Sequence, residues 1–212
     1  MKIIIVASSP VKTFKETYHR NPSDYFIGID GGSLELISRN IKPDVSIGDF
    51  DSAEDLQIIK ENSYDTLFFA KQKDETDLEL ALKFLDTLKG SDNLEIDIYD
   101  AIGGRLDHEL NNYLLMAKYD KYNIRILNKN NEVRYIKEGK IQKINPKNLK
   151  YFSVCALDES VISIKNALYE LDKQEINRTD TYTISNEAID ANTSPIVEVE
   201  KGGVFLFAYY GK

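Results

Sequence analysis

One stretch decides the fold class of this chain, YFIGIDGGSLELISR at residues 25–39. Four of its first five residues are β-branched or aromatic, and the remaining one is a glycine, which is typical of a buried strand. The turn Asp30-Gly31-Gly32 follows, and the apolar residues of 33–39 then recur at helical spacing. The stretch therefore predicts a strand, a tight turn and a helix in direct succession.

The same succession recurs on both sides of this stretch. Further strands are predicted at residues 3–7, 45–47, 66–69, 94–99 and 123–127. Helices are predicted at residues 53–61, 76–88 and 106–119. Repeated alternation of strand and helix indicates a three-layer α/β/α domain with a mainly parallel sheet and helices on both of its faces.

The pattern changes after Glu132, where no long helical period remains. Short strands separated by polar turns are predicted at residues 133–136, 151–156, 161–164, 182–185, 196–200 and 204–209. Several short strands of this kind favour an antiparallel β-sandwich. The polar run 128–131 separates the two patterns, so we expect an α/β domain at residues 1–129 and an all-β domain at residues 130–212.

Composition narrows the function classes. The formal net charge of −8 disfavours nucleic acid as a partner, because a negatively charged protein surface repels the negative phosphates. Cys155 is the single cysteine, so no intramolecular disulfide can form, which suits a reducing compartment. No stretch approaches the roughly 20 apolar residues that a membrane-spanning helix needs. We therefore expect a cytoplasmic protein without a membrane partner.

Acids and glycines follow four successive strands of the predicted parallel sheet. The carboxyl ends of parallel strands meet at one edge of a sheet, where ligands bind. The residues that the sequence brings to this edge are Asp30, Gly31 and Gly32, then Asp49 and Asp51, then Asp74, Thr76 and Asp77, then Asp100, Gly103, Gly104, Arg105 and Asp107. Each group alone is ordinary turn or helix-cap chemistry, but four acidic junctions at one edge call for a common explanation.

A magnesium–nucleotide site explains this edge best. Hard Mg²⁺ prefers carboxylate and phosphate oxygens, and an extended segment would point Asp49 and Asp51 to the same side. Glycines let backbone amides approach phosphates, and Arg105 offers a planar fork for phosphate oxygens. No P-loop or Gly-x-Gly-x-x-Gly motif is present. The residues alone indicate metal-dependent transfer from a phosphoanhydride, and the Asp-x-Asp pair would equally allow a nucleotide-sugar glycosyltransferase.

The ordered motifs resemble those of thiamine pyrophosphokinases over almost the whole chain. The resemblance is carried by Asp30-Gly31-Gly32, Pro43-Asp44 with the stretch 48–52, Lys73-Asp74-Glu75-Thr76-Asp77, and the stretch 103–108 with Asn111 or Asn112. Ser185-Asn186 and the glycines at 202–203 agree with it. The resemblance implies transfer of the diphosphate of ATP to the hydroxyl of thiamine, with AMP as the other product.

The resemblance also implies roles for individual residues. Asp49, Asp51 and Asp77 would be the catalytic residues and hold Mg²⁺. ATP would be bound by Asp30, Gly31, Gly32, Thr76, Arg105 and Asp107. Thiamine would contact Asp77 and, from the other subunit of a homodimer with shared active sites, Ser185 and Asn186.

Three points stay open at this stage. Asp77 is the first candidate for the base that accepts the thiamine proton and Asp51 the second. Some members of the family place a tryptophan near thiamine, whereas this chain has none, so Tyr169, Tyr182 or apolar side chains would form the wall of that site. A thiamine or nucleotide sensor without catalysis is a further alternative. His108 is interpreted as a structural residue.

Overall fold

The computed structural model describes residues 2–50, 52–70, 72–88 and 93–211. The chain forms two compact units. The first unit comprises Met1–Leu115 and Lys121–Lys129, and the second comprises Met116–Asp120 and Asn130–Lys212.

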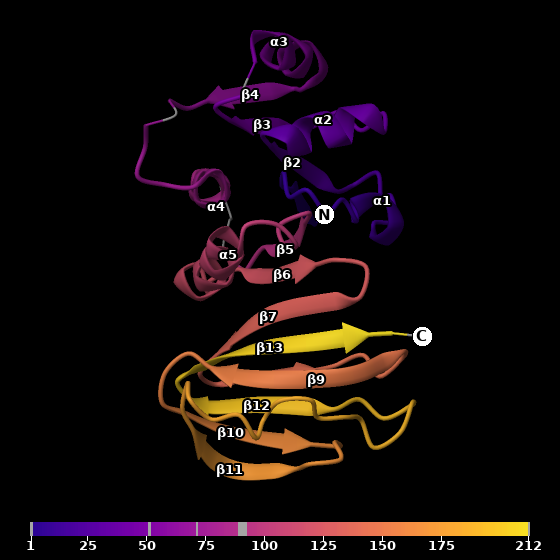
Figure 1. Ribbon diagram of the computed structural model, residues 1–212, viewed down its shortest axis with the longest axis vertical. Helices are drawn as coiled ribbons and strands as arrows, with labels where there is room; N and C mark the ends of the chain where they lie inside the picture. Colours follow the sequence, from indigo (N-terminus) through magenta and orange to yellow (C-terminus); the bar gives the residue numbers. More distant parts are fainter. Residues whose placement is uncertain (1, 51, 71, 89–92, 212) are drawn as a thin grey trace. The chain divides into compact units, whose positions relative to one another are not determined.

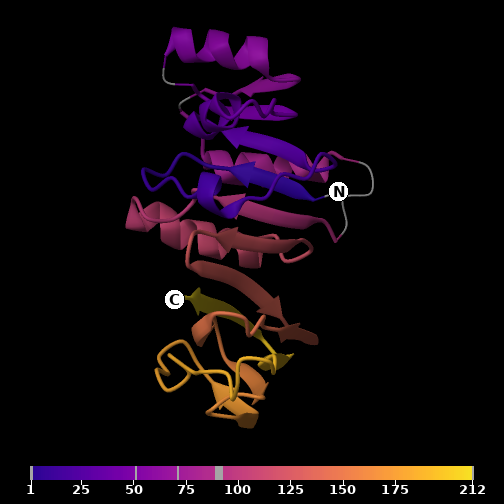
Figure 2. The same cartoon turned by 90° about the vertical axis from the view of Figure 1, so that its right-hand side faces the viewer.

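The first unit contains a parallel sheet in the strand order β4-β3-β2-β1-β5-β6. Neighbouring strands of this sheet lie side by side in both ribbon views (Figures 1 and 2). The strands are β1 Ile3–Val6, β2 Tyr25–Ile29, β3 Val45–Gly48, β4 Asp65–Phe68, β5 Glu95–Tyr99 and β6 Asn123–Leu127. The prediction of a mainly parallel sheet is confirmed.

Helices cover this sheet because its central strands are apolar on both faces. The helices are α1 Phe14–Thr17, α2 Gly31–Ser38, α3 Ala53–Asn62, α4 Asp77–Asp86 and α5 Leu106–Lys118. Phe14 of α1 and Leu36 of α2 pack with Ile4 and Val6 in one buried cluster. The alternate strand positions point to the opposite face, and α4 contacts β2 and β3 with an apolar side that is buried.

The second unit is built from strands alone, apart from its short segment of α5. Its strands are β7 Asn131–Lys137, β8 Lys140–Lys143, β9 Leu149–Ala156, β10 Ser160–Lys165, β11 Leu171–Ile176, β12 Ile196–Lys201 and β13 Gly203–Tyr210. One antiparallel group has the order β7-β13-β9, and a second sheet has the order β11-β10-β12-β8. Buried side chains of both groups form one core cluster, among them Phe152 and Val197. The predicted antiparallel sandwich is confirmed, and with it the fold class.

Three details of the secondary structure differ from the sequence prediction. The expected strand at residues 182–185 is a turn, in which Ser185 adopts a φ of 61° that no strand contains. Strands β8 and β11 were not predicted, because most of their side chains are polar and exposed, as is common at the edge of a sheet. Helix α1 was also missed, since four residues are too few to show a period.

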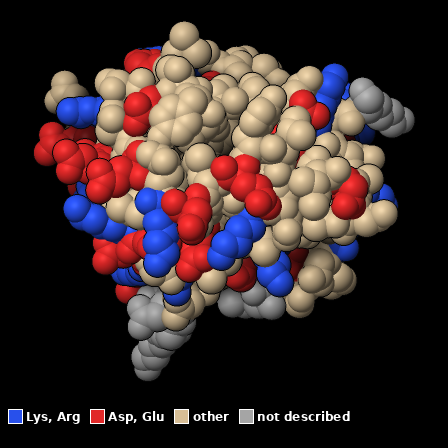
Figure 3. All heavy atoms as spheres, turned by 90° about the horizontal axis from the view of Figure 1, so that it is seen from below, with Lys and Arg blue, Asp and Glu red and all other residues tan. Residues whose placement is uncertain are grey.

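No helix among the described residues combines the length and the apolar character that crossing a membrane requires. On the face of the molecule drawn in Figure 3, basic side chains are interspersed with acidic ones. That face therefore presents no broad surface of a single charge.

Candidate active site

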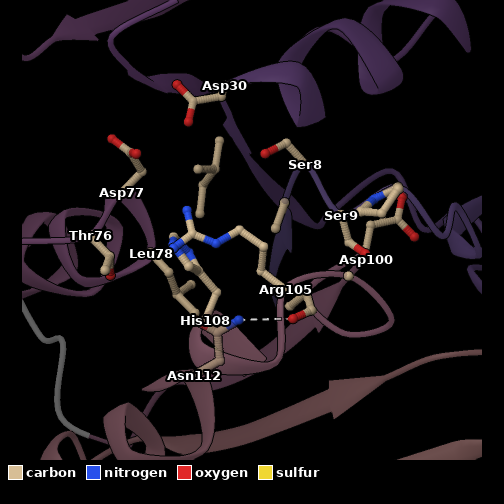
Figure 4. A pocket seen from close by; sticks show the side chains of 15 residues that line it. Ser8, Ser9, Asp30, Thr76, Asp77, Leu78, Asp100, Arg105, His108 and Asn112 are labelled. Atoms are coloured by element: carbon tan, nitrogen blue, oxygen red, sulfur yellow. Dashed lines mark hydrogen bonds between the residues drawn. The ribbon is translucent and has the colours of Figure 1, made fainter. Parts of the chain in front are cut away.

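A pocket of about 270 Å³ lies within the first unit, where the strand order reverses. The chain leaves β1 toward β2 on one side and leaves β5 toward β6 on the other, so the carboxyl ends of β1 and β5 flank a switch point. Figure 4 shows the side chains that surround it. They belong to Ala7, Ser8, Ser9, Pro10, Ile29, Asp30, Thr76, Asp77, Leu78, Asp100, Ala101, Gly104, Arg105, His108 and Asn112.

One wall of the pocket is the segment that follows β1. The amide of Ala7 donates to the carbonyl of Tyr99 at 3.0 Å, and that of Ser9 donates to the carbonyl of Asp100 at 2.9 Å. The hydroxyl of Ser9 also donates to the carbonyl of Ile102 at 2.9 Å. Hydrogen bonds thus join the two chain segments that leave β1 and β5.

Asp100 holds the end of the segment after β1, where this segment meets α1. It is 1% exposed, and its Oδ1 accepts the backbone N–H groups of Thr13 at 2.7 Å and Phe14 at 3.1 Å. Its φ of 53° turns the chain sharply after β5. The position of Asp100 at the pocket therefore follows from its role as an anchor for the start of α1.

The acidic wall of the pocket consists of Asp30 and Asp77, which come from different junctions. Figure 4 shows their carboxylates next to one another on one side of the pocket. Oδ1 of Asp30 also accepts the backbone N–H of Asp49 at 3.2 Å. Burial, followed by the negative charges of Asp77 and Asp49, raises the pKa of Asp30 to about 7. A cation at this wall would relieve the repulsion among the three carboxylates.

Helix α4 places Asp77 at the pocket. The hydroxyl of Thr76 accepts the backbone N–H of Glu79 at 3.3 Å, so Thr76 is the N-cap and Asp77 the first helical residue. This confirms the helix start that the sequence predicts. The carboxylate of Asp77 forms an ion pair with the ammonium of Lys73 from the loop before the helix.

Close approaches require glycine at positions 32 and 48, on the two sides of the turn that contains Asp30. A Cβ atom at Gly32 would lie 1.9 Å from the carbonyl oxygen of Val6, and one at Gly48 would lie 1.8 Å from Oδ1 of Asp30. Gly31 is less restricted, since its nearest neighbour would be Cβ of Ser8 at 3.5 Å. These glycines let α2 start directly behind the acidic wall.

Arg105 reaches the pocket from the start of α5. Its Nε donates to Oδ1 of Asp107 at 3.1 Å and its Nη2 donates to Oδ2 at 2.5 Å. The hydrogen bonds and the positive charge of Arg105 lower the pKa of Asp107 to about 2. Both side chains are more than 60% exposed, so the guanidinium is accessible to an anionic ligand. Asp107 itself does not line the pocket and acts on Arg105 instead.

The Asp-x-Asp segment differs from its prediction. Asp49 lies beside Asp30, as expected, but Phe50 has a φ of 46° and a buried side chain. The chain is therefore not extended through this segment, and the argument that places both acids on one side does not apply. Asp51 lies outside the described residues.

The oxygen donors of the pocket suit magnesium. Among the described residues, no group of three or more His, Cys, Asp or Glu side chains is arranged so that it could hold a metal ion. Mg²⁺ commonly takes one or two carboxylates and completes its shell with phosphate oxygens and water. Asp77 and Asp30 could supply such carboxylates, with Asp49 next to them.

Ser185 and Asn186 belong to the second unit. The side chain of Asn186 is 5% exposed, donates to the carbonyl of Tyr169 at 2.7 Å and accepts the amides of Tyr169 at 3.1 Å and Glu187 at 2.9 Å. Ser185 is exposed, and its amide donates to Oγ of Ser153 at 3.0 Å. Asn186 thus organises this loop, in which Ser185 is an exposed residue.

Sequence reasoning missed Ser8 and Ser9, and it gave His108 and Asn112 no specific place in the site. Ser8 and Ser9 follow β1 without any acid or glycine, although their place after a parallel strand was a usable signal. His108, which the sequence led us to interpret as a structural residue, lines the pocket and is exposed. Asn112 donates to the carbonyl of Ala101 at 2.8 Å and holds the turn before α5 (Figure 4).

Comparisons with known proteins agree with this architecture. The family model "Thiamin pyrophosphokinase, catalytic domain" matches residues 18–128. A thiamine pyrophosphokinase of Bacillus subtilis (strain 168) is 31% identical over 197 residues, which cover 89% of this chain and 91% of that protein.

Solved structures extend the agreement to the whole fold. The crystal structure of thiamine pyrophosphokinase from Bacillus subtilis gives a TM-score of 0.83 at 26% identity, with 100% of both chains covered. That of thiamin pyrophosphokinase from Geobacillus thermodenitrificans gives 0.84 at 26% identity, with 100% of this chain and 99% of the other covered. Sequence and fold thus agree over most of the chain, which belongs to the thiamine pyrophosphokinase family.

Proposed function

We propose that this protein is a thiamine diphosphokinase, which transfers the diphosphate of ATP to the hydroxyl of thiamine and releases AMP. The observation that carries the proposal is the pocket at the switch point, where Asp30 and Asp77 face Arg105 in a chain of this family. Carboxylates that hold a cation and a guanidinium that holds phosphates are the two charges a bound polyphosphate needs.

The reaction forms one bond and breaks another at the β-phosphorus of ATP. The hydroxyl oxygen of thiamine attacks this phosphorus, and the bond to the oxygen that bridges to the α-phosphate breaks, so that AMP leaves. Phosphoryl-type transfers depend mainly on alignment and on neutralising charge. Arg105 would hold phosphate oxygens, the first turn of α2 behind Gly31 would present backbone amides, and Thr76 would line the same site.

The proton of the thiamine hydroxyl needs an acceptor. Asp77 is the first candidate, because its carboxylate lines the pocket at the N-terminal end of α4. Asp51 is the second candidate. Mg²⁺ bound by Asp49, Asp51 and Asp77 would supply charge neutralisation for the phosphate oxygens.

Thiamine would meet the second unit at the loop that contains Ser185. Tyr169 and Tyr182 are 63% and 55% exposed, and Ile184 is 45% exposed. An aromatic face attracts the positively charged thiazolium of thiamine. Tyr169 is the better candidate for the wall, because Asn186 fixes both its N–H and its carbonyl, whereas the hydroxyl of Tyr182 donates to the carbonyl of Glu175.

We further propose a homodimer in which this loop closes the active site of the partner subunit. Subunit complementation tests it. Asp77→Asn and a Ser185→Ala/Asn186→Ala double variant should each be inactive alone, and their heterodimers should regain one intact site. Proven heterodimers without recovered activity would contradict the shared site.

The central experiment measures AMP release from ATP in the presence of thiamine, with and without Mg²⁺. We expect release that requires both thiamine and Mg²⁺. Binding of thiamine and ATP without AMP formation would instead support a sensor, and AMP formation independent of thiamine would exclude the proposed acceptor. The cytoplasmic location stays a prediction, which cell fractionation can check.

A further inference from the structure

Lys73 is the most enclosed lysine among the ion pairs of the described residues. Its side chain is 15% exposed, whereas the other paired lysines range from 34% for Lys2 to 71% for Lys173. Such ammonium groups normally stay in water, at the end of a stem that covers apolar surface. A lysine side chain enclosed to this extent therefore points to a specific partner rather than to a chance surface contact.

The partner of Lys73 is a carboxylate of the acidic wall. Its Nζ pairs with Oδ1 of Asp77, and it lies 5.7 Å from the ring centroid of Phe69. Asp77 lies next to Asp30, and the backbone amide of Asp49 donates to the carboxylate of Asp30. The ammonium thus supplies positive charge to a group of carboxylates that would otherwise repel one another.

The place of Lys73 in the chain allows it to move. It lies in the loop between β4 and α4, four residues before Asp77, which is the first residue of the helix. Its backbone is outside helix and strand, and its side chain is a flexible four-carbon stem with three donors. Asp77, by contrast, is held by the helix that begins with it.

We propose that Lys73 is an exchangeable counter-ion of the acidic wall, which pairs with Asp77 until a divalent cation takes over that carboxylate and then donates to a phosphate oxygen of ATP. This inference rests on the proposed function of the pocket. It assigns Lys73 a role in two binding events, with opposite effects on them. As a competitor it weakens the binding of the free cation, and as a phosphate ligand it strengthens the binding of the nucleotide.

The two effects can be measured without turnover. Binding of Mn²⁺ alone, followed by electron paramagnetic resonance, reports on the cation. Binding of α,β-methylene-ATP at saturating Mg²⁺, followed by calorimetry, reports on the nucleotide, since its methylene group replaces the oxygen that the reaction would cleave. In Lys73→Met we expect Mn²⁺ to bind about tenfold more tightly, because a nearby positive charge is lost. We expect the nucleotide to bind about tenfold or more weakly, because a charge-assisted hydrogen bond is lost.

Two further variants separate charge from general disturbance. Lys83→Met removes the same charge from α4, where Lys83 pairs with Glu75, a carboxylate that does not belong to the acidic wall, and should change either affinity by less than about twofold. Lys73→Arg keeps the charge and should leave the affinity for Mn²⁺ close to that of the wild type. If Lys73→Met does not fold, Lys73→Gln carries the same expectation.

The opposite signs make the inference refutable. Unchanged or weaker Mn²⁺ binding in Lys73→Met would show that Lys73 does not compete with the cation. Unchanged nucleotide binding would show that it does not reach a phosphate. Either result overturns the inference. Failure of the wild type to form AMP would overturn the proposed function instead, because neither titration involves turnover.

Discussion

Replacing Gly48 by alanine should damage the active site while leaving the fold intact. The added Cβ would lie 1.8 Å from Oδ1 of Asp30 and 2.8 Å from its Cγ. Ordinary contact begins near 3.4 Å, so the carboxylate oxygen has to withdraw by roughly 1.6 Å. It is the end of a flexible side chain and can rotate away, which a backbone atom could not do.

The displacement removes specific interactions of Asp30. Its hydrogen bond from the amide of Asp49, 3.2 Å long, would break, at a cost of about 1.5–3 kcal/mol for a bond to a charged group. Its position beside Asp77 would change as well. Misplacement of a site by about 1 Å commonly costs about 100-fold in rate, so we expect kcat/KM to fall by that order. The melting temperature should fall by roughly 5–10 °C, since each kcal/mol corresponds to about 2–4 °C in a chain of this size.

A double-mutant cycle tests whether Asp30 mediates the effect. AMP release and thermal melting are measured for Gly48→Ala, Asp30→Ala and the double variant. Truncating Asp30 removes the atoms that the new methyl group meets, so Gly48→Ala should cost less than about threefold in the Asp30→Ala background. Equal losses in both backgrounds would refute the reasoning, as would a Gly48→Ala protein with wild-type activity.

Three other predictions follow from single contacts. Gly32→Ala should destabilise the fold by about 3 kcal/mol or more, lowering the melting temperature by roughly 10 °C, because its Cβ would meet the β1 carbonyl of Val6, whereas Gly31→Ala should melt within a few degrees of the wild type. Arg105→Lys should weaken kcat/KM for ATP about tenfold, because a lysine cannot reproduce the bidentate fork, and an unchanged value would leave Arg105 as a partner of Asp107 alone. Burial raises the pKa of the Cys155 thiol, so less thiolate is present at neutral pH and iodoacetamide should label the native protein more slowly than the unfolded one, with equal rates contradicting this.

The sequence was sufficient to predict the layers of the fold, because hydrophobic periodicity and turn residues indicate the same helices and strands along most of the chain. It was insufficient where the local pattern is weak. Strand β11, Leu171–Ile176, has only one buried residue and pairs at an edge, so its composition resembles that of a loop. The segment 182–185 looks like a strand, but the hydroxyl of Thr183 donates to the carbonyl of Val154 at 2.6 Å and the chain then turns at Ser185. In both segments, contacts with residues distant in sequence determine whether a strand or a turn forms.

Some features of the candidate site could likewise be predicted from the sequence, and others could not. Residue types and their place after parallel strands were enough to bring Asp30, Asp77 and Arg105 to one pocket. The pairing of Lys73 with Asp77 and the contribution of the β1 junction were not predictable, because they depend on side-chain positions and on the strand order. The order of β1 and β5 in the sheet, which sets the switch point, is a property of the folded chain.

Several residues at the carboxyl edge of the sheet have a backbone conformation that is unfavourable for stability and that is better explained by a binding site. Asp30, Phe50 and Asp100 follow β2, β3 and β5, and all three have positive φ without being glycine. Each such residue costs on the order of 1 kcal/mol or more, and such strain gathers at functional sites. At the same edge, Asp30 is buried beside two other carboxylates, which disfavours its charged form. At Asp30 and Phe50, glycine would adopt the same φ without strain, and acids placed further apart would not repel one another. The buried strands on both sides hold this arrangement in place, and the cation and polyphosphate that we propose for this site would make it favourable.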